Sequence, residues 1–153
     1  MTFEELISGL GSKIGVELTS EDGECVINVD DMVVTLMSLP DCGRFAIHGE
    51  IGDPPPEGLE RLLSSMLEAN HLFAGTAGAT ISRDHDTGRL HLCRQEPLAI
   101  LNADALAAIL QSFVNTLEIW RRAIADYRPP AEGGTPRPAE PEPDLGLDGL
   151  MRV

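Results

Sequence analysis

Three runs of strand character follow one another at short spacing near the start of the chain, and this spacing constrains the fold most. The runs are ECVINV (24–29), MVVTLMSL (32–39) and RFAIHGEI (44–51). The two-residue and four-residue segments between them are rich in Asp, Pro and Gly, which are turn residues. A parallel crossover needs about a dozen residues or more, so these three neighbours must pair antiparallel.

Helical patterns lie on both sides of these strands. Thr2 and Glu5 have the spacing of a capping box at the start of an amphipathic first helix. A second helix begins after the prolines 54–56, carries its apolar stripe from Leu59 onward and ends at Gly75, and a long third helix runs from a cap at Asn102 to about Tyr127. Two further strand patterns are GATISRD (78–84) and RLHLCRQE (89–96). The order α-β-β-β-α-β-β-α predicts an α+β domain, an antiparallel sheet packed by helices.

The stretch SRDHDTGRLHLCR (82–94) gathers two histidines, two aspartates and a cysteine, a composition that could serve a metal. Strand alternation directs His91 and Cys93 away from the neighbouring leucines, whereas His85 lies in the connection between two strands. A metal site needs three or four converging ligands, so we interpret the stretch as a hairpin whose Asp and Gly residues form the turn. The alternative is a small metal-dependent enzyme that uses Asp84, His85, Asp86 and His91.

No other pattern is typical of an active site. The string GLGSKIG (9–15) lacks the GxGxxG spacing and follows a helix, so it is a glycine-loosened helix end. Ser64 and Ser65 lie within a helix, and the three cysteines form no CxxC pair. We therefore expect no catalytic residue, no metal, no cofactor and no enzymatic activity.

The chain carries a formal net charge of -14, from 11 basic and 25 acidic residues. Phosphate binding requires a cationic surface, and Arg121-Arg122 is the sole basic cluster, so nucleic acid and anionic membranes are poor partners. The sequence shows no apolar leader and no run near the ~20 residues of a membrane span. We expect a soluble cytoplasmic protein without membrane insertion.

Composition changes after Tyr127, where Pro, Gly and Glu dominate. We therefore divide the chain into a folded domain, 1–127, and a C-terminal tail, 128–153. The tail ends in DLGLDGLMRV, whose apolar residues are spaced like those of an extended ligand. Our hypothesis is that this end docks on an apolar groove of its own or a neighbouring protomer, through Leu145, Leu147, Leu150 and Met151.

The strand at 32–39 is apolar on both faces, unlike a strand with one wet face. Met32, Val34 and Leu36 share one face, and the other carries Val33, Thr35, Met37 and Leu39. The second helix also has a marked apolar stripe. These residues either fill one core or leave a surface for another chain.

Several strings together resemble the CesT-like (Tir chaperone) family of type III secretion chaperones. They are LEAN (67–70), a Gly-rich step into a strand, GRLHL (88–92) after a turn, EPL (96–98) and the long terminal amphipathic helix. The resemblance extends more weakly over residues 3–51, and size, acidity and element order agree with it. The proline-rich tail departs from the family pattern, so its role stays open.

The resemblance implies a class I chaperone: a bacterial cytoplasmic homodimer that binds the extended N-terminal segment of a secreted effector protein and keeps it soluble and export-competent. An adaptor or regulator outside secretion, on the same fold, is the remaining alternative. The predicted effector-binding residues are Phe3, Ile7, Val33, Thr35 and Met37. The predicted dimer-interface residues are Leu59, Leu62, Leu63, Met66 and Leu67. The two sheet faces are assigned from parity alone and could be exchanged.

Overall fold

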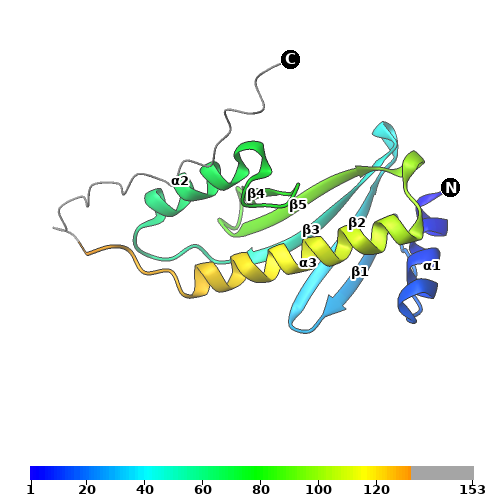
Figure 1. Cartoon of the computed structure of the whole chain (residues 1–153), viewed down its shortest axis with the longest axis horizontal. Coiled ribbons are helices and arrows are strands. Elements are labelled where there is room, and N and C mark those ends of the chain that lie inside the picture. The colour runs from blue at the N-terminus through cyan, green and yellow to red at the C-terminus, as the bar shows by residue number, and fades with distance from the viewer. Residues whose placement is uncertain (132–153) are drawn as a thin grey trace, which may run out of the picture.

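A computed structural model describes residues 1–131 of the chain. Its helices and strands follow the predicted order α-β-β-β-α-β-β-α (Figure 1). The elements are α1 (Phe3–Ile14), β1 (Glu24–Val29), β2 (Met32–Leu39), β3 (Arg44–Gly52), α2 (Leu59–Asn70), β4 (Thr80–Arg83), β5 (Leu90–Pro97) and α3 (Ala103–Ala125). The predicted α+β class is confirmed.

The five strands form one antiparallel sheet in the order β1-β2-β3-β5-β4. The first three are joined by the short turns seen in the sequence, and Asp30 takes a left-handed φ of 52° between β1 and β2. The β4–β5 hairpin adds to β3 through β5, so β1 and β4 are the two edges. Strand β3 therefore lies at the centre, between β2 and β5, although β5 is distant from it in sequence.

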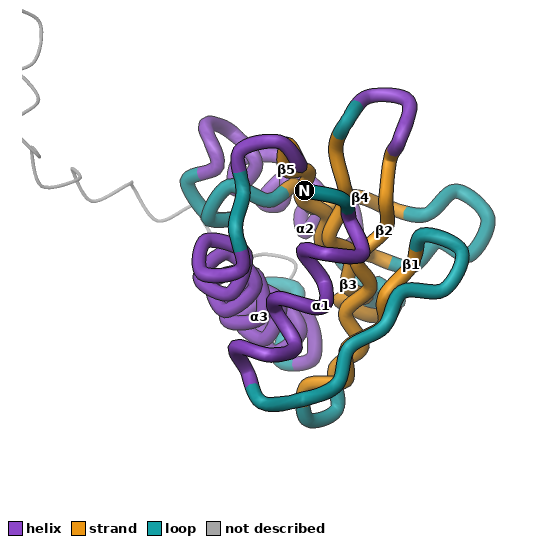
Figure 2. Tube along the Cα trace, turned by 90° about the vertical axis from the view of Figure 1, so that its right-hand side faces the viewer, coloured by secondary structure: helices purple, strands orange, loops and turns teal. Residues whose placement is uncertain are grey.

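Helices α1 and α3 cover one face of this sheet (Figure 2). The core lies between these two helices and the sheet. Its fully buried side chains from the sheet include Val34, Leu36, Phe45, Ile47 and Leu92. Gly49 of β3 allows α3 to approach closely, because a Cβ there would lie 2.6 Å from Cδ2 of Leu117. On the opposite face, the outer face, no helix formed by residues 1–131 crosses the sheet (Figure 2).

Helix α1 begins as its sequence predicts. The Thr2 hydroxyl accepts from the Glu5 amide at 3.2 Å, and Glu5 accepts from the Thr2 amide at 2.7 Å, which completes the capping box. The helix ends at Gly15 with a φ of 77°, so the glycine-rich string is a helix end. Its apolar stripe packs inward, and the Phe3 ring lies 6.0 Å from the ring of Phe45.

Helix α2 begins later than its prolines suggested. Gly58, with a φ of 74°, precedes its first residue and accepts a hydrogen bond from the Tyr127 hydroxyl at 3.1 Å. At its other end, the side-chain Nδ2 of Asn70 donates to the Ile81 carbonyl at 3.0 Å, and its Oδ1 accepts from the Ile81 backbone amide at 2.8 Å. Asn70 therefore acts as a partner for edge strand β4.

Candidate protein-binding site

The outer face carries an apolar stripe over β1 and β2. Val33 and Met37 are 54% and 38% exposed, Val26 is exposed, and Thr35 is half-buried. Val26 and Thr35 are direct cross-strand partners, so the stripe is continuous between the two strands. Exposed β-branched and methionine side chains side by side form a surface suited to an apolar partner.

Strand β1 leaves one side of its backbone unpaired within the described residues. Glu24 uses its outward amide and carbonyl in the turn with Glu21, at 2.9 and 2.8 Å. Outward groups alternate along an antiparallel strand, so Val26 and Asn28 present the next ones. This open edge can pair with one further strand.

An apolar groove of about 180 Å³ runs beside the open edge, between β1 and the first half of α3. It is lined by Ile14, Ile27, Val29, Ala107, Leu110, Gln111 and Val114. A strand added to β1 would place alternate side chains on the two sides of the sheet. One set would enter this groove, and the other would lie beside Val26 on the outer face.

The predicted effector-binding residues fall into two groups. Val33, Thr35 and Met37 lie together on the outer face. Phe3 and Ile7 do not belong to that surface: they are 3% and 0% exposed, because α1 packs against the sheet and α3. Sequence reasoning also missed Val26 and the groove, although the alternation of buried Cys25 and Ile27 with exposed Val26 was a signal for the former.

The predicted interface helix divides its apolar residues between core and surface. Leu62 and Met66 are buried in the protomer itself, Leu59 and Leu63 are half-buried, and Leu67 is 70% exposed. The turn after α2 adds exposed Leu72 and Phe73, both with left-handed φ values, 51° and 59°. Bulky residues rarely adopt this conformation, and here it holds apolar side chains in solvent.

The 82–94 stretch is a hairpin, as predicted. The Asp84 carboxylate accepts from the Asp86 amide at 2.9 Å and the Thr87 hydroxyl at 2.8 Å, and these bonds lower the pKa of Asp84. Gly88 has the left-handed φ of the turn, 73°. Over residues 1–131, no three His, Cys, Asp or Glu side chains come close enough to hold a metal. The proposed metal ligands therefore do not converge.

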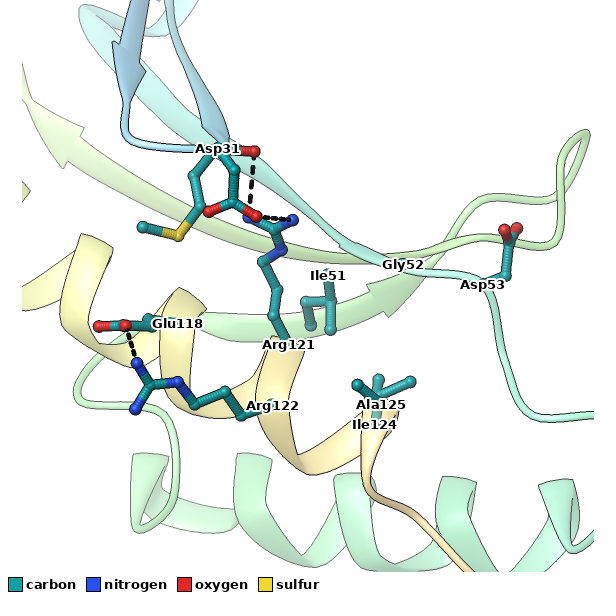
Figure 3. A pocket seen from close by; sticks show the side chains of 10 residues that line it. Asp31, Ile51, Gly52, Asp53, Glu118, Arg121, Arg122, Ile124 and Ala125 are labelled. Atoms are coloured by element: carbon teal, nitrogen blue, oxygen red, sulfur yellow. Dashed lines mark hydrogen bonds and ion pairs between the residues drawn. The ribbon is translucent and has the colours of Figure 1, made fainter.

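A hollow of about 440 Å³ opens where the end of α3 meets the β1–β2 turn and the end of β3 (Figure 3). Its walls contain Ile51 and Ile124, and its two arginines are already engaged (Figure 3). Arg121 binds the Asp31 carboxylate at 3.0 Å, and Arg122 pairs with Glu118 one turn before it. The lining offers paired charges without a nucleophile and base in hydrogen-bond contact, so it supplies no catalytic constellation.

The sequence profile of the Tir chaperone protein (CesT) family matches residues 5–121, more than half of the chain. The chain belongs to the CesT family. The matched range includes every described strand and most of α3, so membership concerns the folded domain as a whole. Among curated proteins, no relative matches the chain.

Solved structures agree with this membership at the level of the fold. The chaperone-effector complex HopA1-SchA contains a chain with a TM-score of 0.66 and 19% identity, over 77% of this chain and 91% of that one. The ExsC-ExsE complex gives 0.67 and 22%, over 81% and 97%. The Yersinia pestis type III secretion chaperone SycH, in complex with a fragment of YscM2, gives 0.64 and 20%, over 78% and 99%.

Within residues 1–131, no helix combines the length and apolarity that crossing a membrane requires.

Proposed function

We propose that this protein is a type III secretion chaperone that binds the extended N-terminal segment of a secreted effector and keeps it soluble and export-competent. The observation that carries the proposal is the open β1 edge, which lies between an apolar groove and the apolar outer face. The family membership and the complexes formed by proteins of this fold support it. Such a chaperone acts in the bacterial cytoplasm, by binding and without catalysis.

Main-chain pairing explains how one edge can hold an unfolded segment. Amide and carbonyl groups of Val26 and Asn28 would bond to the incoming strand, and this requires no particular partner sequence. The groove would select apolar side chains at every second position of that strand. The outer-face stripe would cover a further apolar part of the segment, with Val33, Thr35 and Met37 as contacts.

We further propose a homodimer whose interface includes α2. The exposed apolar side chains of Leu67, Leu72 and Phe73 give this region a surface that a second copy would bury. Half-buried Leu59 and Leu63 lie on the same helix and would contribute their exposed parts. Leu62 and Met66 would act indirectly, by fixing the helix to the protomer core.

The test of the function targets a single backbone group. Val26→Pro removes an outward amide of β1 without removing a bond to β2, and proline is tolerated on strand edges. We expect it to fold and to bind N-terminal segments of proteins encoded beside it about tenfold more weakly or worse, since one hydrogen bond is worth up to about 1.5 kcal/mol and the ring blocks an added strand.

Val26→Ala is the matched control, because it removes the side chain and keeps the amide. A smaller loss of affinity in this variant would separate backbone pairing from side-chain contact. Equal affinity of the proline variant and the unaltered protein for a bound segment would contradict pairing at β1. A partner that is never secreted would instead indicate the adaptor or regulator on the same fold.

A further inference from the structure

Two histidines from the central strands stack on the outer face. His48 of β3 and His91 of β5 have ring centroids 4.7 Å apart and an interplanar angle of 21°. His48 is the cross-strand partner of Thr35 on β2 and of Cys93 on β5. The histidine pair therefore continues the apolar stripe of β1 and β2 across the middle of the sheet.

The pair lies in surroundings that disfavour charge. Both rings are half-buried, and the two ring nitrogens of His91 are shielded from solvent with no hydrogen-bond partner. Burial lowers the pKa of His48, and the neighbouring His91 lowers it further. Burial also raises the pKa of Cys93, so that thiol stays neutral as well.

Charged groups around the pair come from three places. Glu50 of β3 and Asp84 of the hairpin act on His48 in the opposite direction, toward a raised pKa. Arg89, at the start of β5, bonds to Glu50 at 3.1 Å and so offsets its charge. Glu50 is also the direct cross-strand partner of His91, whereas the facing residues on the flanking strands, Thr35 on β2 and Ser82 on β4, are uncharged.

We propose that His48 and His91 determine the specificity of the outer face: their neutral stack binds an uncharged apolar segment, and protonation weakens that binding. This inference rests on the proposed function and identifies the chemistry of the segment that lies over β2, β3 and β5. The cross-strand row that contains Val26, Thr35, His48 and Cys93 carries no charged side chain, and this supports an apolar occupant.

An apolar segment that covers the pair would exclude water from it. An imidazolium is strongly disfavoured in such a desolvated, apolar site. Binding then excludes a proton, and each excluded proton changes the binding constant by at most tenfold per pH unit. A carboxylate-bearing segment would have the opposite dependence, because it would pair with the imidazolium and bind more tightly in acid.

The first experiment uses the free protein and needs no partner. Imidazole NMR signals are followed from pH 8 to pH 5.5. We expect the pKa of His48 to lie below the ordinary histidine value of about 6.5 and to rise in His91→Gln. A His48 pKa at or above the ordinary value, or one that is unchanged in His91→Gln, would overturn the coupled pair.

The second experiment uses the neutral dye Nile red as an apolar probe of the outer face. Val33→Asp should abolish the binding of Nile red to this face. In the unaltered protein, Nile red should bind to this face about threefold to tenfold more weakly at pH 5.5 than at pH 7.5, and the same change should occur in His85→Gln. The His48→Gln/His91→Gln double variant should show no such change.

Loss of affinity in acid that persists in the double variant would overturn the role of the histidines. Tighter binding in acid, or no binding that depends on Val33, would overturn the apolar occupant. These outcomes are distinct from failure of the proposed function, which Val26→Pro tests at the β1 edge through the partner segment itself.

Discussion

The two edge strands of the sheet, β4 and β1, differ in the partners of their outward backbone groups. At β4, the Asn70 side chain bonds to both the amide and the carbonyl of Ile81, and α2 lies along the strand. At β1, the turn residue Glu21 bonds to Glu24 and the rest of the outward backbone has no described partner. Both edges belong to one sheet, and β1 adjoins an apolar groove.

This difference between the edges favours β1 as the strand that pairs with a partner. Exposed strand edges invite association, and proteins usually pair, cover or charge them. Here one asparagine and one helix close β4 within the protomer, so the free pairing capacity is concentrated at β1. The α2 surface is the one that we propose for the dimer interface, so the proposed effector and dimer contacts use different parts of the protomer.

We expect the largest effect from a substitution in α2, the helix that packs against β4. Met66 is buried under α2, so Met66→Asp should lower the free energy of unfolding by about 3–5 kcal/mol, because it places an unpaired charge in the core. Leu67→Asp, on the exposed side of the same helix, should keep the fold and shift the dimer toward monomer. Chemical denaturation and light scattering measure the two outcomes. A Leu67→Asp dimer of unchanged strength would place the interface elsewhere.

A smaller effect is expected at the Asn70 contact itself. Asn70→Ala leaves the Ile81 amide and carbonyl without their partner, which should cost about 1–3 kcal/mol in the free energy of unfolding. The matched variant at the open edge, Asn28→Ala, removes an exposed amide and should change stability by less than about 0.5 kcal/mol. If Asn70→Ala and Asn28→Ala lowered the free energy of unfolding in urea by similar amounts, the proposed difference between the two edges would be contradicted.

The predicted docking of Leu145, Leu147, Leu150 and Met151 concerns residues outside the described range, and it stays a prediction. If this segment competes for the open edge, deletion of residues 129–153 should leave the dimer intact and raise the affinity for effector, because a tethered competitor is lost. Titration calorimetry of full-length and truncated protein with one effector segment measures the difference. Unchanged affinity would argue against competition.

The smallest expected effect is a pH dependence of stability. Because the folded pKa of His48 lies below its unfolded value, the unfolded state binds more protons and stability falls as pH falls from about 7 through the folded pKa. His48→Gln should flatten this part of the stability curve, and His85→Gln should not. Thermal unfolding between pH 7.5 and pH 5.5 checks it. A curve whose slope is the same in all three proteins would exclude a contribution from His48.

Local patterns predicted the elements well because caps, turns and alternation are local. Thr2, Asn102 and Gly88 act as the sequence indicated. Alternation also separated Val33 and Met37 from the buried face of β2. The order of element types and the hairpin at 82–94 followed from the same signals.

Other features depend on packing that no local pattern contains. An amphipathic stripe has the same spacing whether it covers its own core or a partner, so the sequence did not show that Phe3 and Ile7 are buried in the protomer core. The open edge depends on the spatial order of the strands, and the His48–His91 stack depends on the register between β3 and β5. The open edge and the histidine stack can be predicted only once the strand order and register are known.

If effector pairs with β1, as we propose, hydrogen–deuterium exchange of the complex should report the pairing at individual amides of that strand. An effector segment bound to the full chain should slow exchange at the Val26 and Asn28 amides, whose outward groups would gain partners. The Ile81 amide, already bonded to Asn70, should change little. Protection confined to β4 or α2, with Val26 and Asn28 exchanging as in the free protein, would contradict the account.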